Sequence, residues 1–127
     1  MRRPVLLDAS FLIALERETA SNTVGPARQF LPSLRGRTLV VSIVSIEEIL
    51  EGAANEAAAL VTLQRFAIQG LHLAQARRCA LLQRRAPRRM GENDAWLAAT
   101  AESIDADVVA ADRSAFERLA ARYLRFQ

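Results

Sequence analysis

The sequence contains no lysine, and all seventeen of its basic residues are arginine. This absence excludes proteins that need the lysine amine, such as P-loop NTPases, Schiff-base enzymes and phosphorylation-switched receiver domains. A single cysteine, Cys79, excludes an internal disulfide and a cysteine-based zinc site, and it suits the reducing cytoplasm in which we expect the protein to act. His72 is the only histidine and lies in a short apolar run. A lone histidine there is more typical of structure than of catalysis, so we assign it no role.

Long apolar runs and linkers are also missing. No apolar run approaches the ~20 residues that a membrane-spanning helix needs. The N-terminus passes from Arg2 and Arg3 through a few apolar residues directly to Asp8, unlike a signal peptide or an anchor. No Pro-, Gly- or Ser-rich stretch and no internal repeat divides the 127 residues, of which 51% are hydrophobic. We therefore expect one domain over residues 1–127, away from membranes.

Alternation of short apolar runs with helical patterns predicts an α/β fold. Runs rich in aliphatic and β-branched residues predict strands at 5–7, 38–41, 70–73 and 106–110, and a final edge strand at 123–126. Apolar spacing, capping residues and prolines predict helices at 11–18, 26–34, 46–54, 56–67, 74–85, 94–104 and 114–122. The expected architecture is three layers, α/β/α, around a central parallel sheet of four to five strands.

Four acidic residues stand where a predicted strand ends or a predicted helix begins: Asp8, Glu48, Asp94 and Asp112. In an open α/β sheet the ligand crevice lies outside the carboxyl ends of the strands, so a carboxylate after a strand faces that crevice. Asp94 would open an apolar helix that has Asn93 as its N-cap. Two of the acids have structural alternatives: Asp94 can complement the helix dipole, and Glu48 can close a capping box with Ser45.

Other acids and one other enzyme class fit less well. Asp105 and Asp107 lie at the start of the strand predicted at 106–110, at the opposite end of the sheet from the crevice, and we interpret them as turn residues. An aspartate after the first strand also begins the haloacid-dehalogenase phosphatases. That class requires a second aspartate two residues later, where this chain has Ser10, so we exclude it.

The arginines suggest an anionic partner. If the four acids share one cleft, ten acidic and seventeen basic residues remain for the rest of the protein, a balance that suits a phosphodiester substrate. Six arginines are concentrated in thirteen positions: Arg77, Arg78, Arg84, Arg85, Arg88 and Arg89. We interpret Arg77 and Arg78 as a solvated helix face. Arg88 and Arg89 lie in the loop before Asp94, from which they can reach a substrate phosphate.

Four motifs, taken in order and separation, resemble the PIN-domain nucleases and, within them, the VapC-type toxins of bacterial toxin–antitoxin pairs. The motifs are LDAS at 7–10, SIEEILEG at 45–52, NDAWLAATA at 93–101 and VVAAD at 108–112. The resemblance covers essentially the whole chain. It implies that Asp8, Glu48, Asp94 and Asp112 are the catalytic acidic quartet of the family, and that Ser10 is its small polar residue near the first aspartate.

The resemblance implies an endoribonuclease that depends on Mg²⁺ or Mn²⁺ and hydrolyses RNA phosphodiester bonds as the toxin of a type II pair. Crowded carboxylates need a cation, and a hard divalent ion prefers their oxygens. Such an ion can polarise the scissile phosphate and lower the pKa of the attacking water. We expect Asp8, Asp94 and Asp112 to be metal ligands and Glu48 to orient or deprotonate the water.

The resemblance to the PIN-domain nucleases also indicates the expected partners. RNA is the expected substrate, contacted by Ser10, Arg88 and Arg89. The resemblance also implies a homodimer and a cognate antitoxin whose segment lies across a helix groove and whose basic side chain enters the acidic cleft. The alternative is a non-catalytic PIN-like module that binds RNA or protein.

Overall fold

The computed structural model describes residues 2–111, 116 and 122–127. Its centre is a five-stranded sheet in the order β3-β2-β1-β4-β5, in which each neighbouring pair is parallel. The strands are β1 (Val5–Leu7), β2 (Leu39–Ser42), β3 (Ala67–Gln69), β4 (Asp107–Ala110) and β5 (Tyr123–Arg125). β1 lies in the middle, and all three of its residues are buried. The prediction of a parallel α/β sheet is confirmed.

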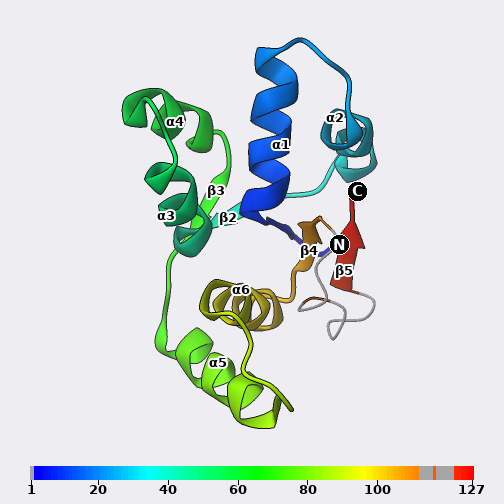
Figure 1. Cartoon of the computed structure of the whole chain (residues 1–127). Coiled ribbons are helices and arrows are strands. Elements are labelled where there is room, and N and C mark those ends of the chain that lie inside the picture. The colour runs from blue at the N-terminus through cyan, green and yellow to red at the C-terminus, as the bar shows by residue number, and fades with distance from the viewer. Residues whose placement is uncertain (1, 112–115, 117–121) are drawn as a thin grey trace.

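Helices cover both faces of the sheet (Figure 1). They are α1 (Ala9–Ala20), α2 (Pro26–Phe30), the 3-10 helix η1 (Leu31–Leu34), α3 (Ile43–Glu51), α4 (Glu56–Leu63), α5 (Leu73–Arg85) and α6 (Glu92–Ser103). Val5 and Leu7 join one apolar cluster with α1 and α3, while Leu6 joins a second cluster with α6. This alternation is the two-residue period of a strand that is buried on both faces. The predicted three layers are therefore confirmed.

The edge strand next to β2 lies at other residues than predicted. The strand expected at 70–73 is wrong, because β3 occupies Ala67–Gln69 and pairs with β2 through Val41 and Ile68. The helix expected to continue to 67 ends at Leu63. His72 is the N-cap residue of α5, and its backbone N–H donates to the side-chain oxygen of Gln75. This local cap favours a helix start over a strand at these residues.

A buried ion pair fixes the amino end of the sheet. Asp107 is the first residue of β4 and is 6% exposed, so the interpretation of Asp107 as a turn residue is wrong. Its carboxylate pairs with Arg3 at 2.9 Å and with Arg37. Asp105 does lie in a turn with a φ of 54° and pairs with Arg122 at 2.7 Å. The two arginines at Asp107 come from distant parts of the sequence, so no local pattern indicates the pair.

Within the described residues, no helix is long and apolar enough to cross a membrane.

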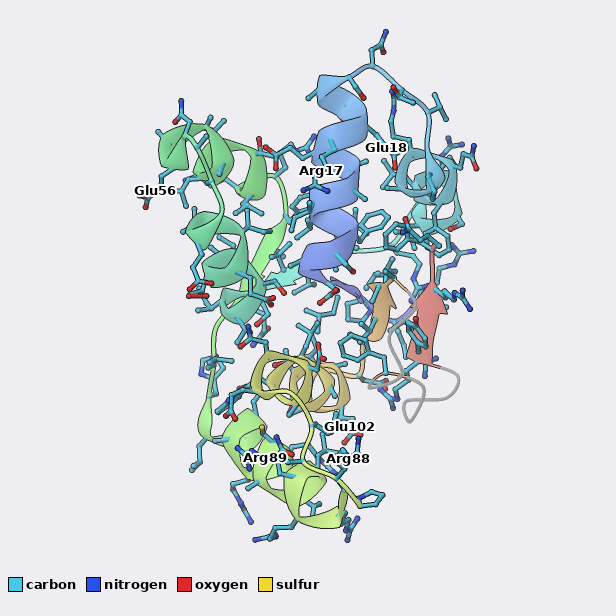
Figure 2. All side chains as sticks on the ribbon, viewed as in Figure 1. Arg17, Glu18, Glu56, Arg88, Arg89 and Glu102 are labelled. Carbon is cyan, nitrogen blue, oxygen red and sulfur yellow. The ribbon has the colours of Figure 1, made fainter. Side chains whose placement is uncertain are left out.

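The carboxylate of Glu18 caps α2 from the neighbouring helix α1. It accepts backbone N–H groups of Gly25 at 2.9 Å, Ala27 at 3.0 Å and Arg28 at 2.8 Å, and Figure 2 shows Glu18 between the two helices. Desolvation raises the pKa of Glu18, but these hydrogen bonds and the charge of Arg28 outweigh it and lower the pKa below its ordinary value. The N-cap residue Gly25 has no side chain of its own to serve these groups.

We expect Glu18→Gln to destabilise the protein at neutral pH. Because the folded state lowers the pKa of Glu18, its stabilisation is present above the unfolded pKa of roughly 4.3 and is lost as the pH falls through the folded pKa. The difference in urea midpoint between wild type and Glu18→Gln should therefore shrink between pH 7 and pH 4. Glu16→Gln, on the exposed part of the same helix, is the matched control. A difference independent of pH would contradict this role of the charge.

Candidate active site

Asp8 lies directly after the central strand, at its carboxyl end. Its backbone N–H donates to the carbonyl of Val109 at 3.0 Å, which extends the β1–β4 ladder by one residue. Its side chain is the N-cap of α1 and accepts the backbone N–H of Ser10 at 3.1 Å. The residue is only 2% exposed. Asp8 is therefore a buried carboxylate whose direction is set by the start of α1.

Ser10 connects Asp8 to the end of β4. Its hydroxyl donates to Oδ2 of Asp8 and accepts the backbone N–H of Ala111 at 3.1 Å. The next residue, Asp112, lies outside the described residues. Ser10 thus orients the first aspartate and holds the chain that leads to the fourth acid. Its contact with a substrate stays a prediction.

Glu48 lies in the second turn of α3. The side chain of Ser42 caps this helix by accepting the N–H of Val44 at 3.1 Å, so α3 begins at Ile43. Ser45 is therefore inside the helix, and the alternative in which Ser45 and Glu48 form a capping box is wrong. The prediction failed because two serines precede the helix pattern, and the first of them ends β2 and starts the helix. Glu48 is half-buried.

Asp94 lies in the first turn of α6, where it is half-buried. The helix begins at Glu92 with Gly91 as N-cap, so the expected cap at Asn93 is wrong. The first helical hydrogen bond runs from the N–H of Ala95 to the carbonyl of Gly91 at 2.9 Å. A Cβ on Gly91 would lie 3.5 Å from Oδ2 of Asp94, so the Asp94 carboxylate lies close to the N-cap residue of its own helix.

Gln83 clamps the loop that precedes Asp94. Its side-chain amide donates to the carbonyl of Met90 at 3.1 Å, and its side-chain oxygen accepts the N–H of Met90 at 2.9 Å. Met90 is 9% exposed. This two-way pairing joins the last turns of α5 to the residue before Gly91. Sequence reasoning missed Gln83, because a glutamine in an arginine-rich helix carries no signal of this role.

Arg89 is engaged beside the same helix start. It pairs with Glu92 at 2.8 Å, and Glu92 also accepts the indole N–H of Trp96 at 3.2 Å. The Arg89 and Glu92 side chains are 71% and 61% exposed, so this pair is weak and easily exchanged. Arg88 is exposed, and Figure 2 shows both arginines beside α5. Their predicted contact with a phosphate stays a prediction.

Three of the four acids come from elements that pack together. Asp8 precedes α1, Glu48 is on α3 and Asp94 is on α6, and α3 packs against both α1 and α6 (Figure 1). Among the described residues, no three His, Cys, Asp or Glu side chains form a group that could hold a metal ion. The donor chemistry nevertheless suits Mg²⁺ or Mn²⁺, because these hard ions prefer carboxylate oxygens and retain several waters.

An apolar groove lies beside this region, between α1 and α4. Its volume is about 390 Å³. The apolar lining comes from α1, α3 and α4 and from the residues after α4: Leu12, Leu15, Ala20, Ile49, Ala59, Val61, Leu63 and Phe66. Glu16 and Arg65 are the charged residues of the lining. Val61 is 68% exposed. An apolar groove of this kind is suited to a partner segment rather than to a charged substrate.

Comparison with known proteins gives a family and several structures of the same fold. The family model "PIN domain" matches residues 5–122. No curated protein matches the chain. A toxin–antitoxin complex from Klebsiella pneumoniae has a TM-score of 0.80 at 20% identity and covers 97% of this chain and 98% of that chain.

Two further structures are similar over nearly their full length. VapBC-1 from nontypeable Haemophilus influenzae has a TM-score of 0.71 at 19% identity and covers 96% of this chain and 97% of that chain. DNA-bound VapBC from Salmonella typhimurium has a TM-score of 0.72 at 20% identity, with coverage of 99% and 100%. At these identities the solved structures establish the fold. The family match spans residues 5–122, which is most of the chain, so the chain belongs to the PIN-domain family.

Proposed function

We propose that this protein is a metal-dependent endoribonuclease and the toxin of a toxin–antitoxin pair. The observation that carries the proposal is the placement of Asp8, Glu48 and Asp94 on three neighbouring elements of a PIN domain, with Asp8 buried and oriented by Ser10. The toxin role is supported by the similar structures, which are toxin–antitoxin and VapBC complexes.

The acids, Ser10 and the two arginines have different proposed roles in phosphodiester hydrolysis. Asp8, Asp94 and Asp112 would hold a divalent ion, which when bound polarises the scissile phosphate and lowers the pKa of a bound water. Glu48, half-buried on α3, orients the attacking water or takes its proton. Ser10 keeps the Asp8 carboxylate in one direction through its N–H and hydroxyl. Arg88 and Arg89 would contact phosphates of the RNA.

The proposed protein partners use other surfaces. An apolar antitoxin segment would bind in the groove between α1 and α4, and a basic side chain beyond that segment would enter the acidic cleft. We also propose a homodimer. Exposed apolar side chains gather at the free edge of the sheet and the start of α5: Ile68, Leu71 and Leu73. A monomeric mass by light scattering at micromolar concentration would contradict the dimer.

Asp8→Asn and Asp94→Asn should each reduce RNA cleavage by on the order of 10²-fold, because each removes a charge that stabilises the reacting centre. Cleavage of a fluorescent RNA with Mg²⁺ or Mn²⁺ measures the rate, and EDTA should abolish it. Asp105→Asn is the matched control, since Asp105 lies in the turn before β4 at the other end of the sheet. Circular dichroism should show the same fold in all variants. Cleavage that survives exhaustive chelation would refute the mechanism and favour a module without metal catalysis.

Gln83→Ala should weaken the apparent affinity for Mg²⁺ and lower kcat by about tenfold, because Asp94 loses the clamp that positions its helix start. The Mg²⁺ concentration at half-maximal cleavage is the readout, since a general loss of stability would not shift it. Gln64→Ala removes an exposed glutamine at the end of α4 and serves as the control. An unchanged Mg²⁺ dependence in Gln83→Ala would show that the clamp does not position Asp94.

Val61→Asp should weaken inhibition by the co-encoded antitoxin at least about tenfold, because binding would bury a charge among the apolar side chains of the groove. RNA cleavage by the variant alone should be unchanged. Val24→Asp is a matched control, because Val24 is 61% exposed and lies outside the groove. Equal inhibition of both variants would place the antitoxin elsewhere.

A further inference from the structure

The outer face of α5 is left uncovered by the fold. α5 packs against α6, where Cys79 of α5 is buried in the same apolar cluster as Leu97. Figure 1 shows α5 on the side of α6 that is away from the sheet. On the opposite side of α5, Arg77, Ala80 and Arg84 are exposed. No other described element packs extensively on α5.

This face is strongly cationic. Residues 73–90 contain six arginines and no acidic residue. Arg78 pairs with Glu102 of α6 at 3.3 Å, and Arg89 pairs with Glu92. Four arginines form no ion pair with any residue that the structure describes: Arg77, Arg84, Arg85 and Arg88. Arg84 and Arg85 lie in the last turn of α5, where they complement the helix dipole. Arg77 lies in the first half of the helix and Arg88 lies beyond its end, so the dipole does not account for them.

The shape of the face suits an extended polyanion. A shallow groove of about 680 Å³ runs along it, lined by Ala74, Arg77, Arg78, Ala80, Leu81 and Arg84. The alanines leave the helix surface open between the long side chains. Arg77 and Arg84 are seven residues apart, which places their Cα atoms about 10.5 Å apart along the helix axis at roughly 1.5 Å per residue. Two guanidinium groups at this spacing can hold separate phosphates of one backbone.

We propose that the outer face of α5 is a second RNA-binding surface, which holds the phosphate backbone of the substrate beyond the cleaved bond. The inference rests on the proposed ribonuclease function and extends it to RNAs long enough to reach this face. The loop of residues 86–91 carries Arg88 and leads into the first turn of α6, where Asp94 lies. Basic residues therefore run from α5 toward the carboxylates. Arg77 serves this surface rather than a merely solvated helix face.

Binding of a fluorescein-labelled RNA hairpin to the full chain tests the surface. The Asp8→Asn background prevents cleavage during the measurement. The double variant Arg77→Gln/Arg84→Gln should raise Kd about tenfold, and the slope of log Kd against log salt should fall by roughly 0.7–0.9 for each arginine. Arg35→Gln/Arg65→Gln is the matched control, because it removes the same charge from exposed residues of another groove, which residues of α1 and η1 line.

Cleavage separates this inference from the proposed function. With Asp8 intact, Arg77→Gln/Arg84→Gln should cut a hexanucleotide at the wild-type rate and cut the hairpin more slowly at subsaturating RNA. Equal Kd values and salt slopes for the two double variants would overturn the inference. The inference would also be overturned if Arg77→Gln/Arg84→Gln changed the mass by light scattering and left RNA binding unchanged, because the face would then contact a second copy of the chain. If wild type cuts no RNA, the proposed function fails, and the Kd comparison still decides whether α5 binds RNA.

Discussion

The hydrogen bonds of Ser10 join the three pieces of chain that meet at the carboxyl edge of the sheet. Its N–H and hydroxyl hold Asp8 at the end of β1, and its oxygen accepts the N–H of Ala111 after β4. A buried carboxylate is costly unless hydrogen bonds serve it, so these contacts permit Asp8 to be 2% exposed. The same bonds start α1. The position of Asp8, the direction of α1 and the end of β4 therefore depend on one another.

The strand order explains why this edge collects functional groups. After β1 the chain adds β2 and then β3 on one side, and β4 and β5 on the other. The direction of winding thus changes at β1, and Asp8 follows that strand. Ligands of open α/β sheets bind outside the carboxyl ends of the strands at this switch point. Glu48 is on α3 and Asp94 is on α6, and these two helices lie on opposite faces of the sheet. The helices α3 and α6 pack against each other.

Apolar patterns in the sequence predicted the buried strands correctly. Where two residues could each cap a helix, the sequence did not indicate which of them begins it. The run at Val5–Leu7 predicted a buried parallel strand, which lies at the centre of the sheet, and the acid after it was placed correctly at its carboxyl end. Two helix starts were predicted at the wrong residue. Ser42 rather than Ser45 is the N-cap of α3, and Gly91 rather than Asn93 is the N-cap of α6, because the preceding chain fixes where each helix begins. The Gln83 clamp joins groups that only the folded chain brings together, so no spacing predicts it. The roles of the acids in catalysis stay predictions.

Each end of the sheet holds a buried aspartate, Asp107 at the amino end and Asp8 at the carboxyl end. At the amino end, the carboxylate of Asp107 meets the guanidinium groups of Arg3 and Arg37, and this pairing neutralises it within the chain. At the carboxyl end, the N–H and hydroxyl of Ser10 donate to the Asp8 carboxylate and hold it in one direction. An oriented negative charge beside further acids attracts cations from solution or from a partner. The ion pairs at the amino end join Arg3, Arg37 and β4, whereas the proposed metal and phosphate chemistry belongs to the carboxyl end, where Asp8, Glu48 and Asp94 come from neighbouring elements.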